Sequence, residues 1–274
     1  MAKYAPVVPL SIAKFMQTHP HGDLLGGYHL LLAHDILAHP AEYQDVYHMA
    51  RRLNSNSFII LDNSIVELGK AMDMDDLITA AGIIKPDCIV MPDVMGEGLQ
   101  TRKLSDAFYD EYVEYNRRKK IENGIPLMGV LQGSTIEDAI DTAVMFRSMK
   151  YVDYLGVPRI LAEQHGSRMP LLLELLRREF IGSFLGIHLL GFSDNILDDV
   201  SCARLPFVQG IDSTVPVRAA TAGKHISLDG DGWNKALGKR RQWWDEVGVA
   251  DAAANMGIVE DNVRIYRTWI NPSL

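Results

Sequence analysis

The sequence predicts an α/β fold, a (β/α)8 TIM-type barrel that one domain forms over residues 1–274, with additional helices at the C-terminus. Three observations support this prediction. Short apolar runs alternate with longer helix-like segments, as they do in repeated βα units. The runs are continuously apolar, which is typical of strands buried on both faces of a parallel sheet. The length of 274 residues suits a single α/β barrel.

Seven apolar runs are candidate strands. They are residues 28–32, 58–61, 88–91, 127–131, 152–155, 184–190 and 207–211. An eighth strand, which a closed barrel needs, is not evident from the apolar pattern. The candidate that remains for it is the segment from His225 to Leu228.

The segments between these runs have the composition and the lengths of helices. The helical candidates are residues 41–53, 72–84, 99–121, 136–150 and 169–180, followed near the C-terminus by 233–247 and 249–268. Ser134 is expected to cap the helix that begins at Ile136, with Glu137 completing a capping box three residues later.

Composition excludes several classes of protein. Lys and Arg number 27 against 35 Asp and Glu, and a net charge of −8 argues against indiscriminate binding to polyphosphates. The only cysteines, Cys88 and Cys202, cannot build a multi-cysteine zinc site or a disulfide framework, so we expect a reducing compartment. The first six residues lack a signal-peptide core and no run of about 18 apolar residues follows. We therefore expect a cytoplasmic protein that no membrane anchors.

Polar residues cluster directly after five of the apolar runs. These residues are Asp62-Asn63, Asp93, Gln132-Gly133, Gly156 and Asp212. In an α/β barrel the carboxyl ends of the strands open on one face, where active sites lie. Any one of these residues could merely cap a helix or form a turn. Three carboxylates and an amide at successive strand ends exceed what capping requires, so the set predicts an active site.

The same positions resemble the motifs of tRNA-guanine transglycosylases. The resemblance covers roughly residues 58–224 and rests on six segments in order: Leu61-Asp62-Asn63-Ser64, Val90-Met91-Pro92-Asp93, Gly129-Val130-Leu131-Gln132-Gly133, Tyr154-Leu155-Gly156-Val157, His188-Leu189-Leu190-Gly191 and Asp212-Ser213-Thr214-Val215-Pro216-Val217-Arg218. The last segment is the most specific, because it keeps a Pro four residues and an Arg six residues after the Asp.

The resemblance implies catalytic roles for two carboxylates. Asp212 would attack C1′ of a nucleotide, expel guanine and form a covalent glycosyl ester. A nearby carboxylate stabilises the oxocarbenium-like state of such a displacement. Asp62 would handle the proton that the incoming base loses.

The resemblance also implies a pocket for the base. Asp93 would accept the N1 and N2 hydrogens of a guanine-like ring, and Gln132 would donate to O6. The backbone of Leu155 and Gly156 would complete the recognition, and Leu190 would cover one face of the ring. Asn63 and Gly133 would line the same pocket. No metal and no cofactor is expected.

Two departures from the family affect the expected polymer. Val66 replaces the aromatic residue that normally stacks on the base, and the cysteines of the family's zinc insertion are missing. A short, zinc-free chain resembles the DpdA-type DNA 7-deazaguanine transglycosylases of phages and bacteria. DNA and a free 7-deazaguanine such as preQ0 are therefore the expected partners, in the host cytoplasm if a phage encodes the protein. A tRNA substrate stays open, as does a homodimer or a partner protein.

A basic segment after the expected nucleophile would bind the polymer. Its members are Arg218, Lys224, Lys239, Arg240 and Arg241. Trp243 and Trp244 could stack on an extruded base, or they could be buried packing residues. The run from Arg117 to Lys120 is more typical of a solvated helix end. A base inside a duplex does not expose C1′, so the target nucleotide would be flipped or single-stranded.

Two rival functions stay open. One is a barrel enzyme acting on a small molecule, such as an aldolase or a hydrolase, although none of the runs ends in a Schiff-base Lys or a metal-ligand set. The other is a non-catalytic nucleic-acid-binding subunit, although both Asp212 and Asp62 are present. His29 and His34 are expected to serve packing or hydrogen bonding.

Overall fold

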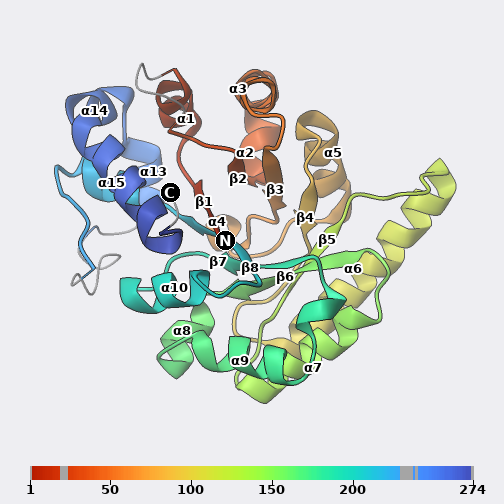
Figure 1. Cartoon of the computed structure of the whole chain (residues 1–274). Helices are drawn as coiled ribbons and strands as arrows, with labels where there is room; N and C mark the ends of the chain where they lie inside the picture. The colour runs from red at the N-terminus through yellow and green to blue at the C-terminus, as the bar shows by residue number, and fades with distance from the viewer. Residues whose placement is uncertain (1, 19–23, 229–236, 238–239, 273–274) are drawn as a thin grey trace. The chain divides into compact units, whose positions relative to one another are not determined.

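The computed structural model confirms the α/β barrel (Figure 1). It describes residues 2–18, 24–228, 237 and 240–272. Eight strands form one sheet in the order β1-β8-β7-β6-β5-β4-β3-β2. Every strand thus neighbours its successor in sequence except β1, which pairs with β8. Because the first strand pairs with the last, the sheet of parallel βα units forms a nearly closed barrel.

The strands coincide with the predicted apolar runs, with one addition. Their bounds are β1 (Lys3–Pro6), β2 (Tyr28–Leu32), β3 (Phe58–Asp62), β4 (Cys88–Val90), β5 (Leu127–Val130), β6 (Val152–Pro158), β7 (Gly186–Leu190) and β8 (Val208–Ser213). All seven predicted strands are present, as β2 to β8. Their interiors are buried on both faces, as the continuous apolar pattern predicted.

The prediction for the missing strand was wrong. The segment from His225 to Leu228 lies in no strand, and the missing strand is β1 at the N-terminus. β1 pairs in parallel with β8 and aligns Ala5 with Asp212. It escaped the apolar pattern because it has only four residues, of which Lys3 is exposed and Pro6 lacks a backbone N–H.

Helices follow the strands as predicted. Their bounds are α1 (Leu10–Gln17), α2 (Ala33–Ala38), α3 (Pro40–Leu53), α4 (Ile65–Leu68), α5 (Met74–Ile84), α6 (Gly98–Lys119), α7 (Ile136–Arg147), α8 (Ile160–His165), α9 (Met169–Arg177), the 3-10 turn η1 (Ile181–Ser183), α10 (Ile196–Ala203), α11 (Val215–Thr221), α13 (Arg240–Glu246), α14 (Val249–Ala254) and α15 (Met256–Ile270). The predicted helix over residues 249–268 is two helices, which meet at Asn255.

The cap of α7 lies one residue later than predicted. Thr135, rather than Ser134, is the N-cap, and its Oγ1 accepts a hydrogen bond from the N–H of Asp138 at 3.1 Å. Asp138 in turn accepts from the N–H of Ser134 at 3.2 Å. Asp138, rather than the predicted Glu137, thus makes the side-chain contact at this helix start, and it reaches the residue before the N-cap.

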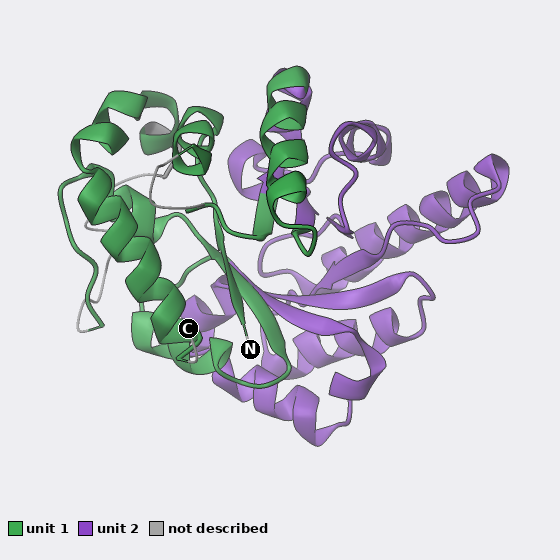
Figure 2. Ribbon diagram, turned by 45° about the horizontal axis from the view of Figure 1, so that its top comes forward, with its two compact units in different colours: residues 1–30, 41–58, 191–274 green, residues 31–40, 59–190 purple. Residues whose placement is uncertain are grey.

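The chain divides into two compact units, which Figure 2 colours separately. Unit 1 comprises residues 1–30, 41–58 and 191–274, and it contains β1, β8 and the C-terminal helices. Unit 2 comprises residues 31–40 and 59–190, and it contains β4 to β7 with α4 to α9. None of the described helices is both long enough and apolar enough to cross a membrane.

Candidate functional site

Asp93 is the centre of a hydrogen-bonded cluster in unit 2. It follows β4 and is only 3% exposed. Its Oδ1 accepts a hydrogen bond from Asn63 Nδ2, and its Oδ2 accepts one from Gln132 Nε2, both at 2.7 Å. Asn63 follows β3 and Gln132 follows β5, so three neighbouring parallel strands bring these side chains to one edge of the sheet. The sequence prediction that strand-end residues 63, 93 and 132 lie together is confirmed.

The backbone fixes the orientation of both amides. Asn63 Oδ1 accepts from the N–H of Ile65 at 3.0 Å, and Gln132 Oε1 accepts from the N–H of Gly96 at 2.9 Å. Each amide nitrogen must therefore face Asp93, because a flip would set N–H against N–H. Asn63 Nδ2 also donates to the carbonyl of Met91 at 2.8 Å, so both its hydrogens are used inside the protein.

Electrostatics at Asp93 have two opposing causes. Burial raises the pKa of the carboxyl because the anion loses its hydration, and this effect is the larger one. The hydrogen bonds from Asn63 and Gln132 lower the pKa, because they stabilise the anion. Two donors that cannot turn away favour a carboxylate that accepts hydrogen bonds over a carboxylic acid that donates one.

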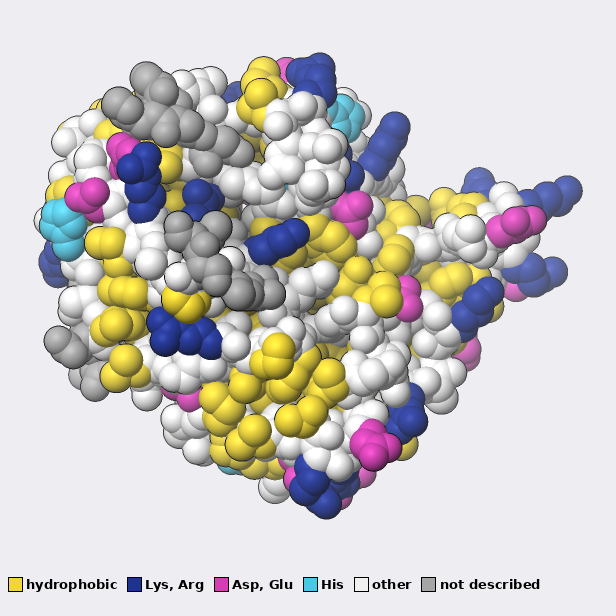
Figure 3. Space-filling model, viewed as in Figure 1, with side chains coloured by type: hydrophobic (Ala, Val, Ile, Leu, Met, Phe, Trp, Pro, Cys, Tyr) yellow, Lys and Arg dark blue, Asp and Glu magenta, His cyan; other side chains and the backbone are white. Residues whose placement is uncertain are grey.

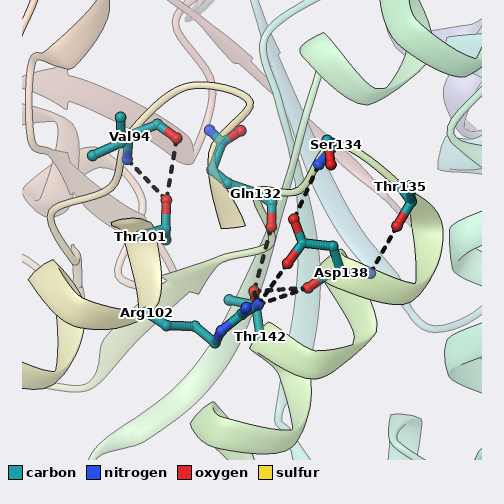
Figure 4. Close-up of polar contacts among 8 residues, drawn as sticks. All are labelled: Val94, Thr101, Arg102, Gln132, Ser134, Thr135, Asp138 and Thr142. Atoms are coloured by element: carbon teal, nitrogen blue, oxygen red, sulfur yellow. Dashed lines mark hydrogen bonds and ion pairs between the residues drawn. The ribbon is translucent and has the colours of Figure 1, made fainter. Parts of the chain in front are cut away.

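A second layer of contacts holds Gln132 (Figure 4). Its backbone carbonyl accepts a hydrogen bond from Thr142 Oγ1 at 3.3 Å. Arg102 Nη1 donates to Thr142 Oγ1 at 3.0 Å and to Asp138 Oδ1 at 2.8 Å. These hydrogen bonds attach α6 to the first turns of α7. Through Thr142 they also hold the backbone that follows β5. Figure 4 shows these side chains converging behind Gln132.

The loop that carries Asp93 is tied to α6 in a similar way. Thr101 Oγ1 bonds both the N–H and the carbonyl of Val94, at 2.9 and 3.1 Å. Ser105 Oγ donates to the carbonyl of Pro92 at 2.9 Å. Thr101 and Ser105 are fully buried. The residues on either side of Asp93 are thus fixed, which leaves its carboxylate little freedom.

Each of the two predicted pocket glycines has a packing reason of its own. A Cβ on Gly133 would lie 2.6 Å from the backbone nitrogen of Ala139, so only glycine lets the loop approach α7. A Cβ on Gly156 would lie 2.5 Å from Leu190 Cδ1. Leu190, which is partly exposed, thus fills the space over Gly156, and Leu155 is fully buried. Contact of these four residues with a base stays a prediction.

Asp62 ends β3 and is partly exposed. Its Oδ2 accepts a hydrogen bond from the N–H of Ser64 at 3.0 Å. Ser64 has a left-handed backbone with φ 60°, and its Oγ accepts from the N–H of His34 at 3.3 Å. This tight turn orients the carboxylate of Asp62. Val66, which replaces the family's aromatic residue, is 47% exposed in the helix that follows.

Asp212 lies in unit 1, near the end of β8, and is 5% exposed. Its Oδ1 accepts a hydrogen bond from the backbone N–H of Gly191 at 2.8 Å. A backbone donor to a carboxylate forms a charge-assisted bond, which fixes the orientation of the side chain. The carboxylate is therefore buried and hydrogen-bonded, and it lies at the carboxyl end of a strand, where the sequence predicted it.

Arg218, a predicted contact to the nucleic acid, is largely buried. It is only 2% exposed, and its Nη2 donates to the carbonyl of Leu237 at 3.2 Å. Its guanidinium lies 5.8 Å from the centre of the Trp243 ring, and Trp243 Nε1 donates to Thr221 Oγ1 at 2.9 Å. Both side chains attach α13 to α11. For Trp243 the packing alternative fits these contacts, and contact of Arg218 with a nucleic acid stays a prediction.

The other predicted polymer contacts are less constrained. Lys224 is exposed just after α11. Arg240 and Arg241 begin α13, but their side chains and Lys239 lie outside the described residues. Their role in binding a nucleic acid stays a prediction.

The basic run at the end of α6 has the features of a solvated helix end. Arg117 forms a two-point ion pair with Glu114, with both contacts at 2.8 Å. On the face in Figure 3, basic and acidic side chains alternate at the tip of the helix that projects from unit 2. The mixed charge favours no particular partner.

The histidines support the packing interpretation. His29 is 1% exposed and packs edge-on against Tyr47, with ring centres 5.2 Å apart. Burial lowers the pKa of His29 to about 4, and the cations Arg267 and Arg51 contribute in the same direction. Within the described parts of the chain, no group of three or more His, Cys, Asp or Glu could hold a metal ion.

Two residues that were not predicted from the sequence hold the backbone of β8 and of the α11 region that follows it. The hydroxyl of Tyr4 donates to the carbonyl of Ser213 at 2.9 Å. Asn262, fully buried on α15, donates to the carbonyls of Pro216 and Lys224 at 3.0 and 2.9 Å. A signal for Asn262 was present, because it interrupts the apolar stripe of α15 at a position where every neighbour on the stripe is buried.

No family model matches the chain, and no curated protein matches it. The resemblance to guanine transglycosylases therefore rests on the motifs alone.

Proposed function

We propose that the protein is a base-exchange transglycosylase that replaces guanine in DNA with a 7-deazaguanine through a covalent aspartyl-nucleotide intermediate. The observation that supports this proposal best is the buried carboxylate of Asp93, held between two amides that the backbone orients. Such a carboxylate is built to accept hydrogen bonds in one plane and to reject a ligand that offers acceptors.

A guanine-like edge fits this acceptor. Each oxygen of Asp93 accepts one hydrogen bond from an amide, and a carboxylate oxygen can accept a further one from the N1 or N2 hydrogen of the base. Gln132 Nε2 gives one hydrogen to Asp93, and no second acceptor for it occurs among the described residues. That hydrogen is suited to the O6 carbonyl. An adenine-like edge would set its N1 lone pair against the carboxylate, which is unfavourable.

Asp212 is the proposed nucleophile. One of its oxygens attacks C1′ while the bond from C1′ to N9 breaks, and guanine leaves with the bonding electrons and takes up a proton. The incoming 7-deazaguanine then loses its N9 proton and displaces the carboxylate, which restores the glycosidic bond. The bond from Gly191 N–H to Oδ1 orients the attacking group. Asp62 is the proposed acid and base for the two proton transfers.

We propose DNA as the polymer, with a target nucleotide that is single-stranded or flipped from the duplex. The chain has only two cysteines and cannot form the zinc insertion of the tRNA enzymes. Two cysteines, both buried, also suit the reducing environment of a cytoplasm, including that of a phage host. Lys224, Lys239, Arg240 and Arg241 are the proposed contacts to phosphate.

Transfer of a labelled base into polymer tests the proposal. The protein is incubated with labelled guanine or preQ0 and with a single-stranded DNA, a duplex or tRNA, and the label in the polymer is counted. We expect label in DNA and, under denaturing conditions, a covalent protein–DNA adduct. Label that enters only tRNA would contradict the choice of polymer, and label in neither polymer would contradict the proposed function.

A pair of variants tests the nucleophile. Asp212→Ala is expected to lose the adduct and roughly 1000-fold or more in exchange rate, because no other group supplies the attacking oxygen. Asp153→Ala is the matched control, since Asp153 lies near the amino end of β6, whereas the proposed site residues lie at the carboxyl ends of their strands. Full activity in Asp212→Ala would refute the assignment.

A further inference from the structure

We propose that Tyr4 is a positioning residue for Asp212, and that its hydroxyl holds the end of β8 in the geometry that attack on C1′ requires. This inference rests on the proposed function. It assigns a mechanistic role to β1, a strand in which no residue pattern indicates a function.

The N-terminal segment holds the backbone next to Asp212. β1 pairs with β8 so that Ala5 lies opposite Asp212 and Pro6 opposite Ser213. The carbonyl of Ser213 accepts two hydrogen bonds from the N-terminal segment, one from the Tyr4 hydroxyl at 2.9 Å and one from the N–H of Val7 at 3.2 Å. The peptide between Ser213 and Thr214, one residue beyond the proposed nucleophile, therefore cannot rotate without breaking both bonds.

Aromatic packing connects Tyr4 to the residue that follows Gly191. Its ring is 3% exposed and packs edge-on against Tyr266, with centres 4.9 Å apart. Tyr266 in turn lies 6.1 Å from the ring of Phe192. Phe192 directly follows Gly191, whose N–H holds Asp212 Oδ1. One aromatic cluster thus supports both the backbone of β8 and the donor that orients the carboxylate.

The hydroxyl of Tyr4 remains a hydrogen-bond donor. Burial raises the pKa of Tyr4 well above its ordinary value; the cation Arg267 lowers it by less, and the negative charge of Asp212 raises it. The hydroxyl therefore keeps its proton over the whole working pH range. Removing it should lower the rate at every pH without shifting the pH profile.

Tyr4→Phe tests the inference, because it keeps the ring and removes only the hydroxyl. We expect the single-turnover rate of adduct formation to fall at least tenfold, while KM for DNA and for the free base changes less than twofold. The matched control is Tyr112→Phe in unit 2. Tyr112 is 1% exposed, and its hydroxyl donates to the carbonyl of Ile125 at 2.8 Å, so the same type of bond is lost.

A purely structural role predicts a different outcome. It would lower the melting temperature of both variants to a similar extent and leave both rates close to wild type, which would overturn the inference. A Tyr4→Phe variant with a normal rate but a raised KM would overturn it too. A wild-type protein that forms no adduct would refute the proposed function itself, so the two failures can be told apart.

A second variant covers loss of folding in Tyr4→Phe. Replacing Tyr4 with 4-aminophenylalanine keeps the ring and restores an N–H donor toward Ser213. We expect it to fold and to form the adduct more slowly than wild type by two- to tenfold, with KM unchanged. A folded variant whose rate falls more than tenfold despite the restored donor, or a change confined to KM, would contradict a role for the donor in the chemical step.

Discussion

At the scale of single residues, the cluster of Asp93, Asn63 and Gln132 shows how hydrogen bonds impose a charge state. Both amides are oriented by backbone N–H groups, so the two faces that meet Asp93 are donors. The two donors are complementary to the ionised carboxylate of Asp93, and neither the protonated acid nor an amide of the same shape fits them as well. Exchanging the carboxylate for an amide of nearly the same shape therefore tests its electrostatics rather than its packing.

Asp93→Asn is expected to destabilise the protein by about 1–3 kcal/mol, because one N–H of the new amide must face an N–H of Asn63 or Gln132 and both lose their partner. It should also raise KM for the free base. Chemical denaturation and steady-state kinetics measure the two effects. Unchanged stability would mean that the amides can turn, contrary to the contacts with Ile65 and Gly96.

The compensating change is Gln132→Glu in the Asp93→Asn protein. It moves the carboxylate across the same hydrogen bond, so the new carboxylate can accept from the amide at position 93 while Gly96 N–H still has an acceptor. The double variant should recover more than half of the stability lost. Gln132→Glu alone sets two buried carboxylates face to face and should be the least stable of the three at pH 7.

At the scale of elements, the strand ends depend on how closely their loops approach the helices. The loop after β5 passes over the first turn of α7, where Gly133 leaves no room for a side chain. Thr135 caps this turn, and Arg102 of α6 donates a hydrogen bond to Asp138 within it. The position of Gln132 is therefore a property of the α6–α7 contact as much as of its own strand.

Gly133→Ala is expected to lower the free energy of unfolding by about 1–3 kcal/mol, because its Cβ meets backbone atoms that cannot rotate aside. It should also displace Gln132 and raise KM for the base. Gly82→Ala is the control, since a Cβ there meets nothing within 4 Å and the residue lies exposed inside α5. That change should stabilise by about 0.5–1 kcal/mol. Equal effects of the two substitutions would contradict this account.

At the scale of the whole molecule, the barrel was more predictable than its site. Continuous apolar runs identified β2 to β8, because a strand that is buried on both faces is apolar at nearly every position. β1 has no such run, and its burial depends on pairing with β8 at the far end of the sequence. The strand ends placed Asp93 and Gln132, but sequence could not tell that the amide faces Asp93. The burial of Arg218 could not be predicted from the sequence, because contacts with Leu237 and Trp243, which are distant in sequence, create it.

The acid stability of the folded protein depends on the buried His29. Its pKa is about 4 in the folded state against about 6.5 in an unfolded chain, so the unfolded state binds the proton first as pH falls. Stability from this group is complete above about pH 6.5 and is lost progressively between about pH 6.5 and 4, with about 2 kcal/mol lost between pH 7 and 5. The raised pKa of Asp93 acts in the opposite direction, because the folded state binds a proton at this carboxyl more readily than the unfolded state does. Denaturant unfolding of wild type and His29→Gln isolates the histidine, since all other groups cancel in the difference. His29→Gln should lose the slope between pH 7 and 5. An unchanged slope in His29→Gln would show that other groups control the acid response.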